Sequence, residues 1–118
     1  MARAAASAER HDDALRAIAE LQARYPAGPF EPEALLLRSR VLTQARRLAQ
    51  AQRLTEALID DPRLRGKRTD LLRQLGEIWR LRDDCSQARS AWQRALELGL
   101  ASEGASEVRA AMEACGAQ

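Results

Sequence analysis

The segment 68–98 constrains the fold most, because its small and large residues are spaced as two packed helices require. Gly76 precedes Trp79 by three residues, and Ala88 precedes Trp92 by four. A glycine or alanine on a helix face lets a second helix approach closely, and a large side chain one turn away fills the space beside that contact. The segment therefore predicts a helical hairpin whose two tryptophans belong to the core.

Helix-forming residues dominate the rest of the chain as well. Ala, Leu, Arg, Glu and Gln are abundant, aromatic residues are only 3% of 118, and no stretch alternates apolar with polar side chains over the length of a strand. We predict a single all-α domain spanning 1–118. Proline, glycine and aspartate breaks separate the helices that we expect, at 2–9, 12–24, 32–46, 48–60, 68–82, 84–98 and 103–115.

Residues 69–102 match a known repeat pattern, W-x2-L-G-x2-Y followed by A-x3-F and a proline. Leu100 stands where that pattern has its proline. The chain resembles the tetratricopeptide-repeat (TPR) family through the matching residues Leu72, Leu75, Gly76, Trp79, Ala88, Trp92 and Ala95.

Two weaker copies precede this repeat, and they keep part of its spacing. The segment ALRAIAELQARYPAGPFEPEALLLRSRVL also looks like the bacterial TPR-like domains of outer-membrane assembly lipoproteins and membrane-anchored regulators. The resemblance implies a right-handed helical-hairpin solenoid of about two and a half repeats plus a terminal helix. Its expected parts are a partial repeat at 1–26, a degenerate repeat at 32–62, the best-matching repeat at 69–100 and a terminal capping helix at 103–115.

The TPR resemblance also implies a function, which is non-catalytic protein–protein interaction or scaffolding. The first helices of such repeats form a concave face that binds a peptide or a protein surface. A mixture of charges on this face suits a polar peptide or a folded partner, although each residue is equally compatible with an ordinary solvated helix surface. The residues that correspond to this face are Arg38, Asp70, Arg73, Glu77 and Arg80.

Two other binding functions are compatible with the sequence. Residues 33–82 carry a net charge of +6 although the whole chain carries +2, and RLRGKR at 63–68 is the densest basic run. Arginines over 63–82 could bind phosphates, but no aromatic residue interleaves with the basic run to stack on bases. A solenoid cut at its ends could also self-assemble into an oligomer through the faces that normally stack repeats.

Catalysis, metal binding and cofactor binding have no supporting pattern. The only histidine, His11, stands beside Asp12 and Asp13 at an expected helix start, where such side chains act as caps. The spacing of this histidine and the two cysteines is not that of a zinc site, and no glycine-rich phosphate loop is present. We therefore expect no enzyme activity, no metal and no cofactor.

The two cysteines are interpreted through the expected order of helices. Cys85 follows the 68–82 helix, and Cys115 ends the 103–115 helix. In a stack of repeats these two helices should lie side by side. A Cys85–Cys115 disulfide would pin the terminal helix, whereas the alternative is two unrelated thiols in a cytoplasmic protein. A bond would favour an extracytoplasmic, periplasmic location.

Targeting signals give little information about the compartment. No run approaches the roughly 20 apolar residues of a membrane span, so we expect no span in this chain. MARAAASAER lacks the apolar core of a signal peptide and looks like the interior of a helix. This start leaves open whether the chain is part of a longer protein.

Overall fold

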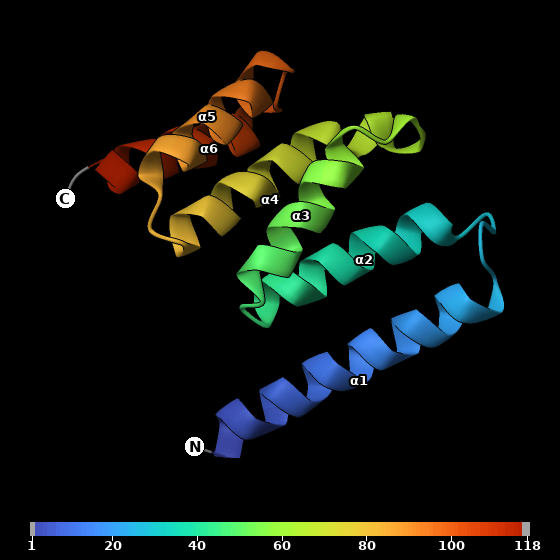
Figure 1. Cartoon of the computed structure of the whole chain (residues 1–118). Helices are drawn as coiled ribbons and strands as arrows, with labels where there is room; N and C mark the ends of the chain where they lie inside the picture. The colour runs from blue at the N-terminus through green and yellow to red at the C-terminus, as the bar shows by residue number, and fades with distance from the viewer. Residues whose placement is uncertain (1, 117–118) are drawn as a thin grey trace. The chain divides into compact units, whose positions relative to one another are not determined.

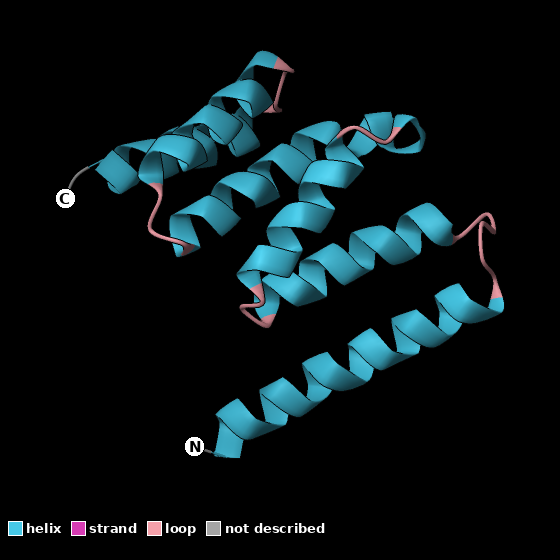
Figure 2. Cartoon of the chain, in the orientation of Figure 1, coloured by secondary structure: helices cyan, strands magenta, loops and turns pink. Residues whose placement is uncertain are grey.

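The computed structural model describes residues 2–116, and these residues form helices joined by short loops, with no strand among them (Figures 1 and 2). The all-α prediction is therefore confirmed. A short 3-10 helix, η1 (Pro62–Lys67), precedes α4. The α-helices are α1 (Ala2–Arg24), α2 (Glu31–Gln44), α3 (Leu48–Ile59), α4 (Arg68–Leu81), α5 (Cys85–Glu97) and α6 (Ser102–Gly116).

The chain divides into two compact units, and the division falls within α3. The N-terminal unit comprises Met1–Leu54, and the C-terminal unit comprises Thr55–Gln118. The first contains the α1–α2 hairpin, and the second contains η1 and helices α4 to α6.

The first predicted helix boundary is wrong, because α1 is one continuous helix rather than two helices at 2–9 and 12–24. His11, Asp12 and Asp13 lie in its interior and do not cap a helix start. The segment has no proline or glycine before the end of α1, so nothing interrupts its backbone hydrogen bonds. Asp13 accepts a hydrogen bond from Arg16 at 2.8 Å, and Asp12 pairs with Arg47 after α2.

The core of the N-terminal unit lies between α1 and α2. Ile18 of α1 is buried with Ala34 and Val41 of α2, and Ala14 and Leu15 pack against them. These α1 residues recur at spacings of three and four, which place them on one side of the helix. The packed side of α1 therefore includes the stretch 14–18, which lies against α2.

The α4–α5 hairpin follows the predicted spacing and gives it a specific meaning. Gly76 is buried, and a Cβ added there would overlap the indole ring of Trp92. Ala88 and Ala95 of α5 are fully buried. The small residue at Gly76 thus makes room for an indole from the opposite helix.

Helix α6 extends this core. Val108 of α6 is buried in a cluster with Ala88 and Trp92, and Trp79 and Met112 pack against that cluster. The guanidinium of Arg82 lies over the ring of Trp79, with its carbon 5.5 Å from the ring centroid. Both tryptophans therefore serve the packing of the C-terminal unit.

A disulfide joins α5 to α6. Cys85 is the first residue of α5, Cys115 lies near the end of α6, and their Cα atoms are 5.7 Å apart. Cys115 also packs against the cluster that contains Trp92. The structure therefore brings together the two cysteines that the helix order placed at one end of the unit.

Candidate interaction site

The four binding residues predicted on α4 lie at helical spacing along that helix, but most of their charges are already paired. Arg73 donates from Nη2 to Oε2 of Glu107 on α6 at 2.8 Å, and Arg80 donates from Nε to Oε2 of Glu77 at 2.9 Å. Asp70 is exposed in the first turn of α4. A partner that bound this face would have to replace the two ion pairs.

The Arg80–Glu77 pair lies on the surface of the C-terminal unit. The hydrogen bond to Glu77 raises the pKa of Arg80 further above its ordinary value, although desolvation acts in the opposite direction. Both side chains are more than two-fifths exposed, and exposed pairs of this kind contribute less than about 1 kcal/mol to stability. The pair therefore satisfies charge locally and does not create a reactive group.

Arg38, the fifth predicted residue, belongs to the N-terminal unit. It is exposed on α2, and its Nη1 lies 3.4 Å from Oε1 of Gln22 on α1. Arg38 also lines a shallow groove between α2 and α3, which we call the arginine groove. The groove is lined by Arg38, Leu42, Gln50, Arg53 and Leu54.

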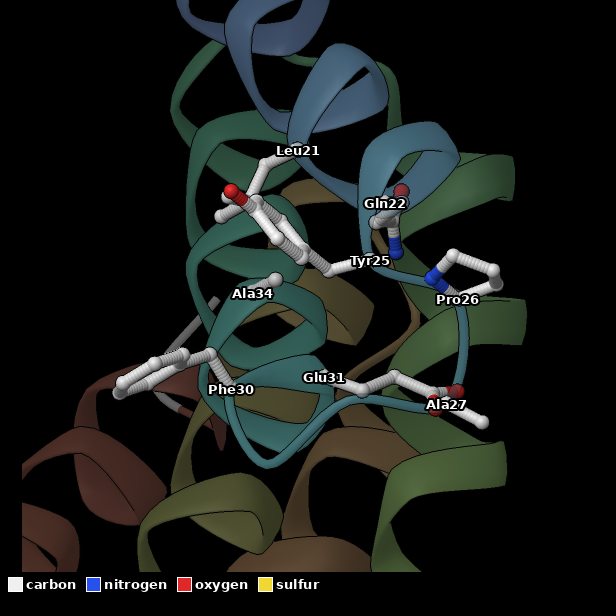
Figure 3. A pocket seen from close by; sticks show the side chains of 8 residues that line it. All are labelled: Leu21, Gln22, Tyr25, Pro26, Ala27, Phe30, Glu31 and Ala34. Atoms are coloured by element: carbon white, nitrogen blue, oxygen red, sulfur yellow. The ribbon is translucent and has the colours of Figure 1, made fainter.

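A second surface of the N-terminal unit, which the sequence analysis did not select, lies where α1 turns into α2. The side chains of Leu21, Tyr25 and Phe30 are 42%, 58% and 68% exposed. They surround a cavity of about 180 Å³, and Ala34 lies between the two aromatic residues (Figure 3). We call this cavity the aromatic slot; its lining residues are Leu21, Gln22, Tyr25, Pro26, Ala27, Phe30, Glu31 and Ala34.

A tight turn between α1 and α2 connects the two aromatic residues of the slot. The backbone N–H of Gly28 donates to the carbonyl of Tyr25 at 3.2 Å, and the N–H of Glu31 donates to the carbonyl of Gly28 at 3.1 Å. Ala27 has a positive φ of 57°, and prolines on both sides restrict the backbone. The turn therefore limits the freedom of the chain that carries the two rings, which lowers the entropic cost of binding.

The sequence did contain a signal for this slot. Tyr25 and Phe30 are the only tyrosine and the only phenylalanine of the chain, and both stand next to prolines of the YPAGPF segment. In the sequence, that segment indicates a break between two helices and forms part of the family resemblance. Aromatic residues placed in a turn, beyond the packed stripes of both helices, could have indicated a surface role.

The arginines considered for nucleic-acid binding are largely engaged within the C-terminal unit. Arg63 donates from Nη2 to Oδ2 of Asp61 at 2.7 Å, and Arg68 donates from Nε to the carbonyl of Ile59 at 3.1 Å. The side-chain hydrogen bond from Arg63, followed by that from its backbone N–H, lowers the pKa of Asp61. Asp61 caps η1 by accepting from the backbone N–H of Arg63, and phosphate binding by the Arg63 guanidinium would compete with its ion pair to Asp61.

No three His, Cys, Asp or Glu residues among the described ones are arranged to hold a metal ion. None of the described helices has both the length and the apolar character needed to cross a membrane.

Comparison of this chain with protein-family models, with curated proteins and with solved structures finds no match. Its function must therefore be inferred from its own residues. Of the surfaces described above, the aromatic slot is the one where large exposed apolar side chains surround a cavity.

Proposed function

We propose that this chain is a non-catalytic protein–protein interaction module, built of TPR-like helical hairpins, that binds its partner through the aromatic slot. The observation that carries the proposal is the exposure of Leu21, Tyr25 and Phe30 around one cavity. Exposed apolar residues that gather at one place, rather than scatter singly, are typical of interaction sites. Aromatic residues in particular are enriched in protein interfaces.

The size of the slot supports a protein partner over a cofactor. Its volume of about 180 Å³ is below the roughly 300–1,000 Å³ of typical small-molecule sites. A cavity of this size suits one large apolar side chain. Interfaces commonly depend on a few such anchors, each buried in a pocket of the other protein. The slot is therefore proposed to receive a single anchor residue.

The burial pattern supports the TPR-like part of the proposal. Gly76 and Ala88, at the two small positions of the best-matching repeat, are both buried. In the degenerate repeat, Ser39 at the glycine position is fully buried. Gln50, which stands where the pattern has its alanine, is exposed, whereas the neighbouring Ala51 is fully buried. Small buried residues thus recur in both repeats at or next to the positions where the family has small residues. In the second repeat the buried alanine comes one position later than the pattern predicts.

The charged face of α4 is a weaker candidate for the partner-binding surface. Its Arg73 and Arg80 already have carboxylate partners within the C-terminal unit. Exchanging an existing ion pair for another one yields little net binding free energy. For this reason we assign the binding function to the slot and not to the face that the family resemblance favoured.

Self-association is a second candidate function, because the same exposed apolar residues could be covered by another copy of the chain. Sedimentation velocity over a range of concentrations would test this. A dimer that the double substitution Tyr25→Ala/Phe30→Ala dissociates would support self-association. A monomer at every concentration would contradict it.

The Cys85–Cys115 disulfide supports a location in an oxidising compartment, such as the bacterial periplasm. Mass analysis after alkylation of the unreduced protein from its native compartment would test this. Two alkylated cysteines would contradict the proposed location.

Selection of short peptides from a displayed random library tests the proposed function. We expect the wild-type chain to enrich peptides with a large apolar residue, and we expect Tyr25→Ala/Phe30→Ala to lose them. Leu37→Ala is the matched control, because Leu37 is a 49% exposed residue of α2 that does not line the slot. Absence of enrichment, or equal binding by the double variant, would contradict the proposal.

A further inference from the structure

We infer that the aromatic slot is one end of a longer binding surface along α2, and that this surface takes an acidic segment of a partner protein carrying one large apolar side chain. The inference rests on the proposed function and adds the chemistry of the partner. It follows from the position of the arginine groove beside the slot and from the charges of that groove.

The slot and the arginine groove take lining residues from one row of positions, which begins at Phe30 just before α2. Phe30, Ala34, Arg38 and Leu42 recur every four residues, a spacing that places helical side chains in a row. The first two line the slot, and the last two line the groove. Arg38 also approaches Gln22, a residue of the slot, at 3.4 Å. A bound segment can therefore pass from one site to the other.

The arginine groove has the charge that an acidic segment requires. Arg38 and Arg53 are both exposed, and neither forms an ion pair with a carboxylate among the residues that the structure describes. Residues 31–54 contain five arginines and two glutamates, of which Glu31 lines the slot and neither lines the groove. A guanidinium binds a carboxylate through two parallel hydrogen bonds, which gives both affinity and orientation.

The apolar residues of the groove suit a protein segment better than a highly charged polymer. Both leucines line the groove with the two arginines; Leu42 is buried, whereas Leu54 is half-buried and leaves part of its apolar surface open. The aliphatic part of an acidic side chain, or an apolar neighbour, can pack on this surface. Together with the slot, the groove therefore favours a segment that combines apolar and acidic residues.

The geometry of α2 sets the expected distance between the apolar anchor and the acidic residue of the partner segment. Ala34 and Arg38 are four residues apart, so the slot and the first arginine are separated by about 6 Å along the helix axis. An extended chain advances about 3.3 Å per residue. We therefore expect an acidic residue about two to four residues from the apolar anchor, since the arginine side chains are long.

The test starts from the peptides that the wild-type chain enriches in the displayed random library. We expect them to carry acidic residues at the stated distance from a large apolar residue. Resynthesis with Asp and Glu changed to Asn and Gln should weaken binding about tenfold, which corresponds to about 1.4 kcal/mol. The measurement is the dissociation constant by fluorescence anisotropy of labelled peptides.

Variants of the chain provide the second half of the test. Arg38→Glu/Arg53→Glu should weaken binding of the acidic peptides at least about tenfold, and Arg38→Gln/Arg53→Gln should weaken it less. The matched control is Arg40→Glu, an exposed residue of the same helix that does not line the groove. We expect this control to change the affinity by less than about threefold. Circular dichroism checks that every variant is folded.

The outcomes separate this inference from the function on which it rests. Peptides that need Tyr25 and Phe30, but lack acidic residues or bind the Arg38→Glu/Arg53→Glu variant normally, would overturn the inference and leave the proposed function standing. Peptides that bind independently of the slot would overturn the proposed function itself. A preference for a nucleic-acid oligonucleotide over every enriched peptide would also overturn the inference.

Discussion

The chain uses its four aromatic residues in two different ways. In the C-terminal unit, Trp92 is only 3% exposed, and Trp79 packs against the same cluster. In the N-terminal unit, Tyr25 and Phe30 are 58% and 68% exposed at the turn between α1 and α2. Aromatic residues of one chain thus serve stability in one unit and are available for recognition in the other.

The surrounding small residues explain this difference. The indole of Trp92 packs between the two helices of a hairpin, where Gly76 leaves room for it. Ala88 is buried in the same core. Tyr25 and Phe30 lie in the turn of prolines and glycine between α1 and α2, where more than half of each side chain stays exposed. An aromatic residue is therefore a core residue where small partners and an additional helix cover it, and a surface anchor where they do not.

The largest expected effect is a loss of stability when the buried aromatic residue of the C-terminal unit, Trp92, is removed. Trp92→Ala should destabilise the C-terminal unit by about 3–5 kcal/mol, because it removes a large buried side chain and leaves a cavity beside Gly76. Urea unfolding followed by the fluorescence of the remaining Trp79 would measure this. Leu98→Ala, at a residue that is 52% exposed, is the control. Equal stability of both variants would show that the core has been misidentified.

The next effect concerns the disulfide. Reduction, or Cys85→Ser/Cys115→Ser, should cost about 3–4 kcal/mol, because the bond closes a loop over a sequence separation of 30 residues. Since both tryptophans lie in the C-terminal unit, their fluorescence reports the loss there. Unfolding midpoints that agree before and after reduction would contradict a stabilising bond.

A smaller effect is expected at Gly76. Gly76→Ala would place a Cβ against the Trp92 indole, and such overpacking costs about 1–3 kcal/mol even though alanine is the better helix former. Gly66→Ala is the matched control, since nothing lies within 4 Å of the added Cβ. If both substitutions stabilised the protein, the indole would not occupy the space at Gly76.

The smallest effect is a pH dependence at η1. The hydrogen bonds from Arg63 lower the pKa of Asp61, so their stabilisation is present above the ordinary carboxyl pKa of about 4 and is lost as the pH falls through the lower pKa of the folded state. Asp61→Asn should therefore lower the thermal midpoint slightly at neutral pH, and the difference from wild type should shrink in acid. Asp60→Asn controls for the loss of one carboxylate. A difference that did not change with pH would rule out this cause.

The all-α class and the hairpin of the C-terminal unit were predictable, because helix breakers and small–large spacings are local features of the sequence. The continuity of α1 does not follow from the local pattern, because Asp12 and Asp13 look like caps. In the structure Asp12 pairs with Arg47, and Asp13 pairs with Arg16. Ion pairs between distant residues, such as Arg73 with Glu107, cannot be predicted from spacing along one helix. For Tyr25 and Phe30 the sequence holds a partial signal, their position in a turn beside prolines, whereas the extent of their exposure depends on what the folded unit leaves uncovered.

The central claim is that the exposed aromatic residues recognise a partner and contribute little to stability. Its most direct test measures both properties of Tyr25→Ala/Phe30→Ala. We predict that the free energy of unfolding changes by no more than about 0.5–1 kcal/mol, as for substitutions at exposed positions. The affinity for a library-selected peptide should fall about tenfold or more. Unchanged peptide affinity, or a loss of stability as large as that of Trp92→Ala, would contradict the claim.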